Sequence, residues 1–103
     1  MEMKQVCFDY LMEQFADEDI VKEIYQEYVN SIEEKSSKLV EALASGDWTE
    51  LGHVAHAIKG NALASGDKAM ADAAIELRVT AQLQNKERSQ ELTDIIKNLA
   101  KEL

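Results

Sequence analysis

The longest regular pattern of apolar residues lies between positions 17 and 44. Apolar side chains return there every three or four residues, with mostly charged and polar residues between them, and this spacing indicates an amphipathic helix about 40 Å long. Asp17 can cap its start, and Gly46 follows its last apolar residues as a left-handed stop. The predicted core positions are Val21, Tyr25, Tyr28, Ile32, Leu39 and Leu43, with Ile20, Ile24, Val29 and Val40 widening the stripe.

Four further segments have helical spacing. A short one covers residues 8–15, and three longer ones cover residues 47–65, 68–84 and 86–102. Asp47 and Asp67 stand at the starts of the first two longer segments, as is typical of helix starts, and Asn85 is expected to end the second of them. The predicted apolar positions are Leu11, Met12 and Phe15 in the first segment; Trp48, Leu51, Ala55, Ile58 and Ala62 in the second; Met70, Ala73, Ala74, Leu77, Ala81 and Leu83 in the third; and Leu92, Ile95, Ile96, Leu99 and Leu103 in the last.

The connections between these segments are only a few residues long, so consecutive long helices must run antiparallel. We therefore predict an all-α fold: an antiparallel up-down four-helix bundle with the short N-terminal helix capping one end. The sequence has no proline and only four glycines, which favours long helices. Residues 1–103 are expected to form a single domain, since this length supports one modest core.

The chain is acidic, with 20 Asp and Glu against 11 Lys and Arg and a formal net charge of −9. Most of its surface would repel a phosphate backbone, so we expect protein partners and no nucleic acid. Cys7 is the only cysteine and cannot form an internal disulfide, and neither a signal-peptide pattern nor a membrane span is apparent. These features predict a cytoplasmic protein that does not contact a membrane.

On a helical wheel of residues 47–65, His56 lies about 140° from the apolar face, on the side expected to be exposed. Its neighbours by angle are Thr49, Gly52, His53, Gly60 and Leu63. Two of these are glycines, each of which weakens a helix interior by about 1 kcal/mol relative to alanine. Gly60 lies about 180° from the apolar face, so we interpret it as clearance for a second protein that approaches His56. Gly52 could serve clearance or helix packing.

Lys59 follows His56 by one helical turn, so the two side chains could receive an anion such as a phosphoryl group. Glu50, His53 and His56 stand at a spacing that could bind metal, but the chain has only these two histidines, and we expect no metal site. Cys7 has no evident catalytic partner, so hydrolysis by a nucleophilic thiol is not indicated.

The stretch His56-Ala-Ile-Lys59-Gly60, followed by Gly66 and the apolar Met70, Ala74 and Leu77, resembles the signature of histidine-containing phosphotransfer (HPt) domains. The resemblance implies that His56 is the phosphoacceptor, through Nε2, that Lys59 stabilises charge on the phosphoryl group, and that the chain needs no cofactor, because Mg²⁺ belongs to the partner. The sequence departs from many members at Asn61, where Ser or Ala is common, and at Arg78, where Glu is common. These departures bear on partner choice.

The resemblance implies a phosphoprotein of a two-component phosphorelay, in which His56 accepts a phosphoryl group from a receiver-domain aspartate and passes it to another receiver. The expected partners are response-regulator receiver domains and a hybrid histidine kinase, with the chain acting as a monomeric phosphocarrier without kinase activity of its own. Residues expected to contact them are Gly52, His53 and Leu63, with Met12 or Phe15 from the first helix.

Two alternatives to the relay remain open. Phosphoacceptor modules of chemotaxis-type histidine kinases carry a similar pattern and receive phosphate directly from an ATP-binding kinase domain. The 103-residue sequence contains no such domain, which favours the relay. A helical adaptor that binds proteins without carrying phosphate is the other alternative. His56→Gln separates these hypotheses, because an adaptor should still work with this substitution, whereas a phosphorylated module should stop.

Overall fold

The computed structural model describes residues 2–103, which form five α-helices and no strand. The all-helical prediction is therefore confirmed. Two predicted boundaries were wrong: the first helix begins at Gln5 instead of residue 8, and the fourth ends at Gln82, because Leu83 and Gln84 form a turn in which Gln84 has a φ of 53°. The helices are α1 (Gln5–Phe15), α2 (Glu18–Ser45), α3 (Trp48–Ala64), α4 (Lys68–Gln82) and α5 (Lys86–Lys101).

Each of the four longer helices begins at an Asp or Asn whose side chain accepts hydrogen bonds from backbone N–H groups of the first turn. These groups have no partner within the helix, so the caps define where each helix starts. After α2 and α3, Gly46 and Gly66 adopt a left-handed φ of 71°, which lets the chain reverse within two and three residues, respectively. The capping bonds are Asp17 to Asp19 N (3.0 Å) and Ile20 N (3.2 Å), Asp47 to Glu50 N (3.1 Å), Asp67 to Met70 N (3.3 Å) and Asn85 to Arg88 N (3.1 Å).

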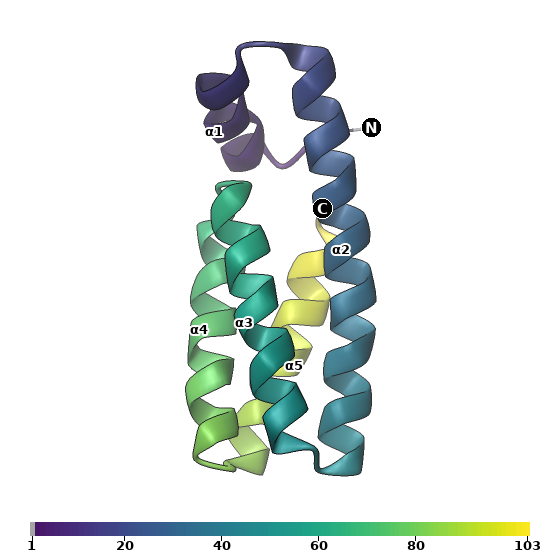
Figure 1. The fold of residues 1–103 in the computed structure, drawn as a ribbon, viewed down its shortest axis with the longest axis vertical. Helices are drawn as coiled ribbons and strands as arrows, with labels where there is room; N and C mark the ends of the chain where they lie inside the picture. The colour runs from purple at the N-terminus through teal and green to yellow at the C-terminus, as the bar shows by residue number, and fades with distance from the viewer. Residues whose placement is uncertain (1) are drawn as a thin grey trace.

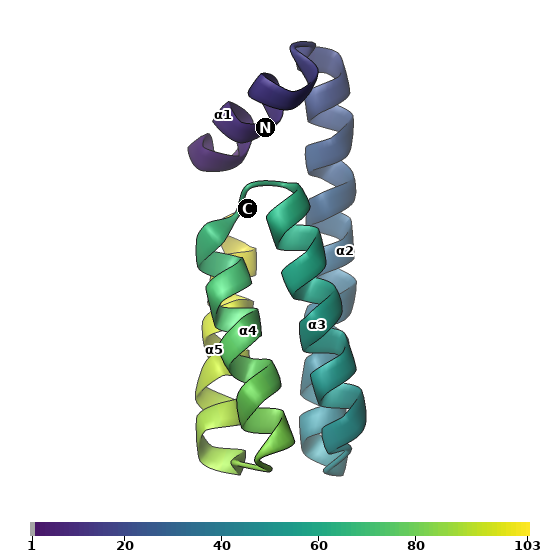
Figure 2. The same cartoon turned by 60° about the vertical axis from the view of Figure 1, so that its left-hand side comes forward.

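Helices α2 to α5 lie side by side along the long axis of the molecule, and the chain descends α2, climbs α3, descends α4 and climbs α5 in the view of Figure 1. α2 and α4 each pack against both α3 and α5. The 28 residues of α2 rise about 42 Å, which equals the 42 Å length of the molecule. The first turns of α2 therefore extend past the shorter helices, and α1 packs against them beyond the α3–α4 turn (Figures 1 and 2).

Most of the predicted apolar positions lie in one continuous core, to which α1 contributes Cys7 and Leu11. Five predicted apolar positions lie outside the core, because Leu83 is 73% exposed and Phe15, Ile20, Val40 and Ile95 are also exposed. Leu83 follows the last residue of α4 and Phe15 is the last residue of α1. The other three lie at the edges of wide apolar stripes, where the adjacent helices do not reach them. Ile24, Trp48, Leu99 and Leu103 are half-buried against the core.

A buried carboxylate links the α3–α4 turn to the N-terminal segment. Asp67 is fully buried, and its Oδ2 accepts a 2.7 Å hydrogen bond from the hydroxyl of Tyr28 on α2, while its Oδ1 lies 2.8 Å from the ammonium of Lys4. Burial and the bond to Asp67 raise the pKa of Tyr28 above its ordinary value of 10.0. The charge of Asp67 is thus compensated where it is removed from water, as a buried carboxylate requires.

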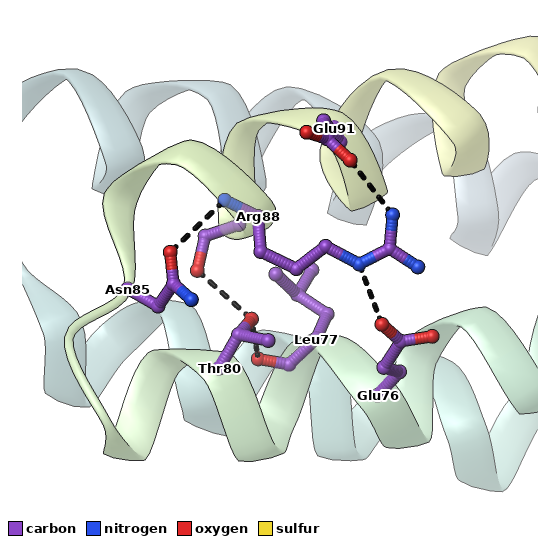
Figure 3. A network of polar contacts seen from close by, with 7 residues as sticks. Glu76, Leu77, Thr80, Asn85, Arg88 and Glu91 are labelled. Carbon is purple, nitrogen blue, oxygen red and sulfur yellow. Dashed lines mark hydrogen bonds and ion pairs between the residues drawn. The ribbon is translucent and has the colours of Figure 1, made fainter.

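A polar network joins α4 to α5 at the other end of the molecule (Figure 3). The guanidinium of Arg88 on α5 lies 2.6 Å from Glu76 of α4 and 2.8 Å from Glu91 of its own helix. In the same region, the buried hydroxyls of Thr80 and Ser89 lie 2.9 Å apart and form a hydrogen bond between the two helices. Glu76 and Arg88 therefore neutralise each other between α4 and α5.

None of the helices within residues 2–103 combines the length and the hydropathy that a bilayer crossing requires.

Candidate functional site

His56 lies on the face of α3 that points away from the core. The residues that anchor α3 are all buried, whereas His56 is exposed, as the helical wheel predicts. Because these anchors recur at helical spacing, they fix the rotation of α3 and therefore the direction in which the imidazole projects. The anchors are Leu51, Val54, Ala55, Ile58 and Ala62.

The imidazole of His56 contacts an arginine of the neighbouring helix. Nη1 of Arg78, on α4, lies 3.0 Å from Nδ1 of His56, which is hydrogen-bonding distance. A guanidinium has only donors, so Nδ1 must accept this bond with its lone pair, and the ring proton of neutral His56 lies on Nε2. The sequence identified Arg78 as a departure from the family pattern but did not predict this contact.

The charges around His56 favour its neutral form. Arg78, and then Lys59, lower the pKa of His56 from its ordinary value of 6.5, with smaller contributions from burial and from His53. The direction follows from electrostatics, because a second positive charge is disfavoured beside existing ones. At neutral pH the imidazole is therefore mostly uncharged, and an uncharged imidazole has one nitrogen with a free lone pair, which a nucleophile requires.

Two open hollows flank Arg78 along the α3–α4 seam. Ile75 and Val79, which are 45% and 49% exposed, supply apolar surface to the hollow beside His56. Lys59 and Arg78 supply its charged groups. Such a mixture of exposed apolar surface and a few charges is typical of protein-binding surfaces. The hollow beside His56 is lined by His56, Lys59, Ala74, Ile75, Arg78, Val79 and Gln82, and the second by Trp48, Thr49, Gly52, His53, Arg78, Ala81, Gln82 and Gln84.

The residues expected to clear space for a partner differ in their surroundings. Gly60 is exposed, and a Cβ placed there would meet no atom within 4 Å, whereas a Cβ on Gly52 would lie 3.9 Å from Cβ of Ala81. Gly52 therefore faces α4 and allows ordinary helix packing, while the surface at Gly60 is open. Leu63, on the same side of α3, is 53% exposed. Lys59 is only half-buried, so its ammonium can reach solvent.

Of the two α1 residues expected to contact a partner, Phe15 is exposed, but Met12 is partly buried against the core. The sequence could not show which of the two side chains is free, and Phe15 is the more exposed one, because α1 packs its Met12 side toward the end of the bundle. His56 lies eight residues before Ala64, where α3 ends, which corresponds to about 12 Å along the helix. The surface of α1 is therefore separate from the immediate surroundings of the imidazole.

Asn61 pairs with α2. Its Nδ2 donates a 2.7 Å hydrogen bond to Oγ of Ser31, which also accepts from Nζ of Lys35. The residue following Gly60 thus fastens α3 to α2 in this chain. Serine and asparagine on two separate helices carry no sequence signal of this pairing.

Glu50, His53 and His56 do not form a metal site in the described part of the chain, where no three His, Cys, Asp or Glu side chains cluster closely enough to hold a metal ion.

A family profile described as Hpt domain matches residues 23–103. This match covers most of the chain, which therefore belongs to the Hpt domain family, as its sequence signature indicates. Hpt domains act in histidine phosphotransfer and interact with receiver domains and kinases. Searches of curated proteins and of solved structures find no match. The matched range begins within α2, so α1 lies outside it.

Proposed function

We propose that this chain is a phosphorelay intermediate in which His56 accepts a phosphoryl group from a receiver-domain aspartate and passes it to a second receiver. The observation that carries the proposal is an exposed, uncharged imidazole at the edge of an open hollow, with Arg78 and Lys59 beside it. In this proposal residues 1–103 work as a single antiparallel four-helix bundle, capped by α1, and as a monomer.

The nucleophile in this proposal is Nε2. Nδ1 is occupied by Arg78 at 3.0 Å, so the opposite ring nitrogen is the one that an approaching receiver can reach. In the transfer, the ring proton first leaves Nε2, and the freed Nε2 lone pair then forms a bond to phosphorus while the bond from phosphorus to the receiver's aspartyl oxygen breaks, with the electron pair remaining on the carboxylate. Phosphoryl transfer depends chiefly on in-line positioning and on charge stabilisation.

Lys59 is proposed to stabilise the phosphoryl oxygens. It follows His56 by one helical turn and lines the same hollow, so its flexible ammonium can follow the phosphoryl group between donor and acceptor. In a chain of net charge −9, the ammonium of Lys59 supplies local positive charge where an anion can approach. The remaining charge stabilisation would come from the Mg²⁺ that the acidic residues of the receiver hold.

Docking is proposed to use the face of α3 around His56. Gly60 leaves the imidazole accessible, and the exposed side chains of Leu63, Ile75 and Val79 supply apolar contact area. Receiver domains are the proposed partners on this face, with a hybrid histidine kinase upstream.

The test is transfer from a panel of purified, phosphorylated receiver domains to wild-type protein, His56→Gln and the matched control His53→Gln. We expect phosphate on the wild type and on His53→Gln, and none on His56→Gln. Phosphate on His56→Gln would refute the assignment. A separate reaction with ATP and a chemotaxis-type kinase domain tests direct phosphorylation by a kinase. Phosphate on the wild type in this reaction, but from no receiver, would favour that alternative. Unlabelled wild type in both reactions would favour the adaptor.

A further inference from the structure

The hydrogen bond between Arg78 and His56 opposes the chemistry proposed for His56. Arg78 Nη1 donates to Nδ1 at 3.0 Å, which requires the Nδ1 lone pair and leaves the ring proton on Nε2. Attack on phosphorus by Nε2 requires the reverse arrangement, with a lone pair on Nε2 and the proton on Nδ1. In that form an Nδ1–H would face an N–H of the guanidinium, so the two groups would repel.

We propose that Arg78 is a positioning residue that holds resting His56 with its proton on Nε2, so that phosphoryl transfer in either direction requires Arg78 to leave Nδ1. The proposal rests on phosphotransfer at His56 and names the residue that restrains it. Arg78 is an exposed side chain between two open hollows, so it has room to swing away when a partner docks.

The complete reaction has three stages. First, Arg78 withdraws and the ring proton moves through water from Nε2 to Nδ1. Second, the Nε2 lone pair bonds to phosphorus as the bond to the receiver's aspartyl oxygen breaks. Third, the Nδ1 proton of the resulting cationic ring leaves to water, and the free Nδ1 lone pair can again accept from Arg78. The arginine thus stabilises the resting protein and the phosphorylated protein, and opposes the Nδ1–H forms that lie between them.

The groups that face His56 favour this restraint. Arg78 from α4 and Lys59 from α3 are cations, and His53 from α3 adds no negative charge. Glu76, two residues before Arg78, is paired with Arg88 of α5. Within residues 2–103 no carboxylate lies within 4.0 Å of the Arg78 guanidinium or of the His56 ring in an ion pair. No carboxylate of the described residues therefore competes for Arg78 or accepts a proton from Nδ1.

The first test measures the tautomer directly. ¹⁵N NMR of the histidine side chains, assigned with His53→Gln, distinguishes protonated from unprotonated ring nitrogens at a pH where His56 is neutral. We expect the wild type to be almost entirely Nε2–H, Arg78→Met to gain the Nδ1–H form, and Arg78→Glu, which supplies an acceptor, to gain it most. The pKa of His56 should rise in the same order. Arg88→Met is the matched control, since it removes an arginine that pairs with Glu76 and Glu91 instead.

The second test measures rates, using phosphoramidate as a small phosphodonor and phosphorylated receivers as protein donors. Arg78→Met should accelerate phosphorylation of His56 roughly fivefold, the factor that corresponds to losing one hydrogen bond. It should also shorten the lifetime of phosphorylated His56, because Nδ1 is protonated more readily. Arg88→Met should leave both unchanged.

Two results would overturn the proposal. An unchanged tautomer in Arg78→Met and Arg78→Glu would mean that Arg78 does not control the ring. Slower phosphorylation of Arg78→Met would mean that Arg78 acts on the phosphoryl oxygens and does not restrain transfer. The relay itself fails separately: if no receiver phosphorylates the wild type, yet the tautomer order and the phosphoramidate rates are as expected, Arg78 still controls His56 and only the proposed donor is wrong.

Discussion

Gly66→Ala should destabilise the protein much more than Gly46→Ala, although both glycines have a φ of 71°. An alanine in this left-handed conformation costs about 1–2 kcal/mol. At Gly46 a Cβ meets nothing within 4 Å, so only this cost applies. At Gly66 the new Cβ would lie 2.9 Å from Cδ2 of Tyr10 and still closer to its Cβ and Cγ. Overpacking of this kind adds about 1–3 kcal/mol.

The added cost at Gly66 cannot be relieved by a side-chain rotation. The crowded atoms include Cβ of Tyr10, which is attached to the backbone, so α1 itself would have to move away from the α3–α4 turn. The total of about 2–5 kcal/mol corresponds to a fall in the unfolding midpoint of about 8–40 °C for a domain of this size, against about 4–16 °C for Gly46→Ala.

Thermal unfolding of both variants can be followed by circular dichroism. Tyr10→Gly is the control, because it removes the Cβ of Tyr10 with which the new alanine Cβ would clash. In the Tyr10→Gly background, Gly66→Ala should cost no more than Gly46→Ala costs in the wild type. Equal losses for the two alanine variants in the wild-type background would refute the reasoning and would mean that α1 is not seated against the α3–α4 turn.

Three further predictions concern the candidate site and the core. Lys59→Ala should shift the unfolding midpoint by less than about 8 °C and slow single-turnover transfer; an unchanged rate at saturating receiver would remove Lys59 from the mechanism. Gly60→Leu should unfold no more easily than the wild type, because the site is open and leucine favours helix, while transfer falls about tenfold or more; normal transfer would show that no clearance is needed there. The free energy of unfolding should fall between pH 9.0 and about 11. The unfolded Cys7 thiol ionises at its ordinary pKa of 9.0, whereas burial raises the pKa of the folded thiol to about 11. The folded state therefore binds more protons over this range, and stability is lost as the pH rises. Denaturant titrations across this range should show a shallower decline for Cys7→Ala, and an equal decline would exclude the thiol as a cause.

The helices could be predicted from the sequence because each repeats an apolar stripe, and each of the four longer ones starts at an Asp or Asn that caps it. The exposure of His56 followed from the same periodicity, since the stripe fixes which face of α3 is buried. The periodicity does not show how many of the flanking apolar residues are buried, because this depends on how far the neighbouring helices extend over them. Ile20, Val40 and Ile95 were therefore assigned to the core although they are exposed.

Contacts between helices carry no such signal. The sequence marked Asp67 as a helix start but could not show that Tyr28 and Lys4 would bury its carboxylate. It marked Arg78 only as an unusual residue, because the 3.0 Å approach to His56 depends on the register of α3 against α4. The position of the phosphoacceptor candidate was thus predictable, while the groups that set its proton location were not.

The hydroxyl of Tyr25 accepts a hydrogen bond from the backbone N–H of Lys4 at 3.1 Å and donates one to the carbonyl of Leu103 at 2.8 Å. A single side chain therefore holds two segments from opposite ends of the sequence beside each other. This proximity makes the fold suitable for circular permutation: a short flexible linker could join residue 103 to the N-terminal segment, and new ends could be opened at the exposed Leu83–Asn85 turn. Since His56 and Arg78 lie on consecutive helices before that turn, the permuted chain would keep both residues on one uninterrupted helical hairpin.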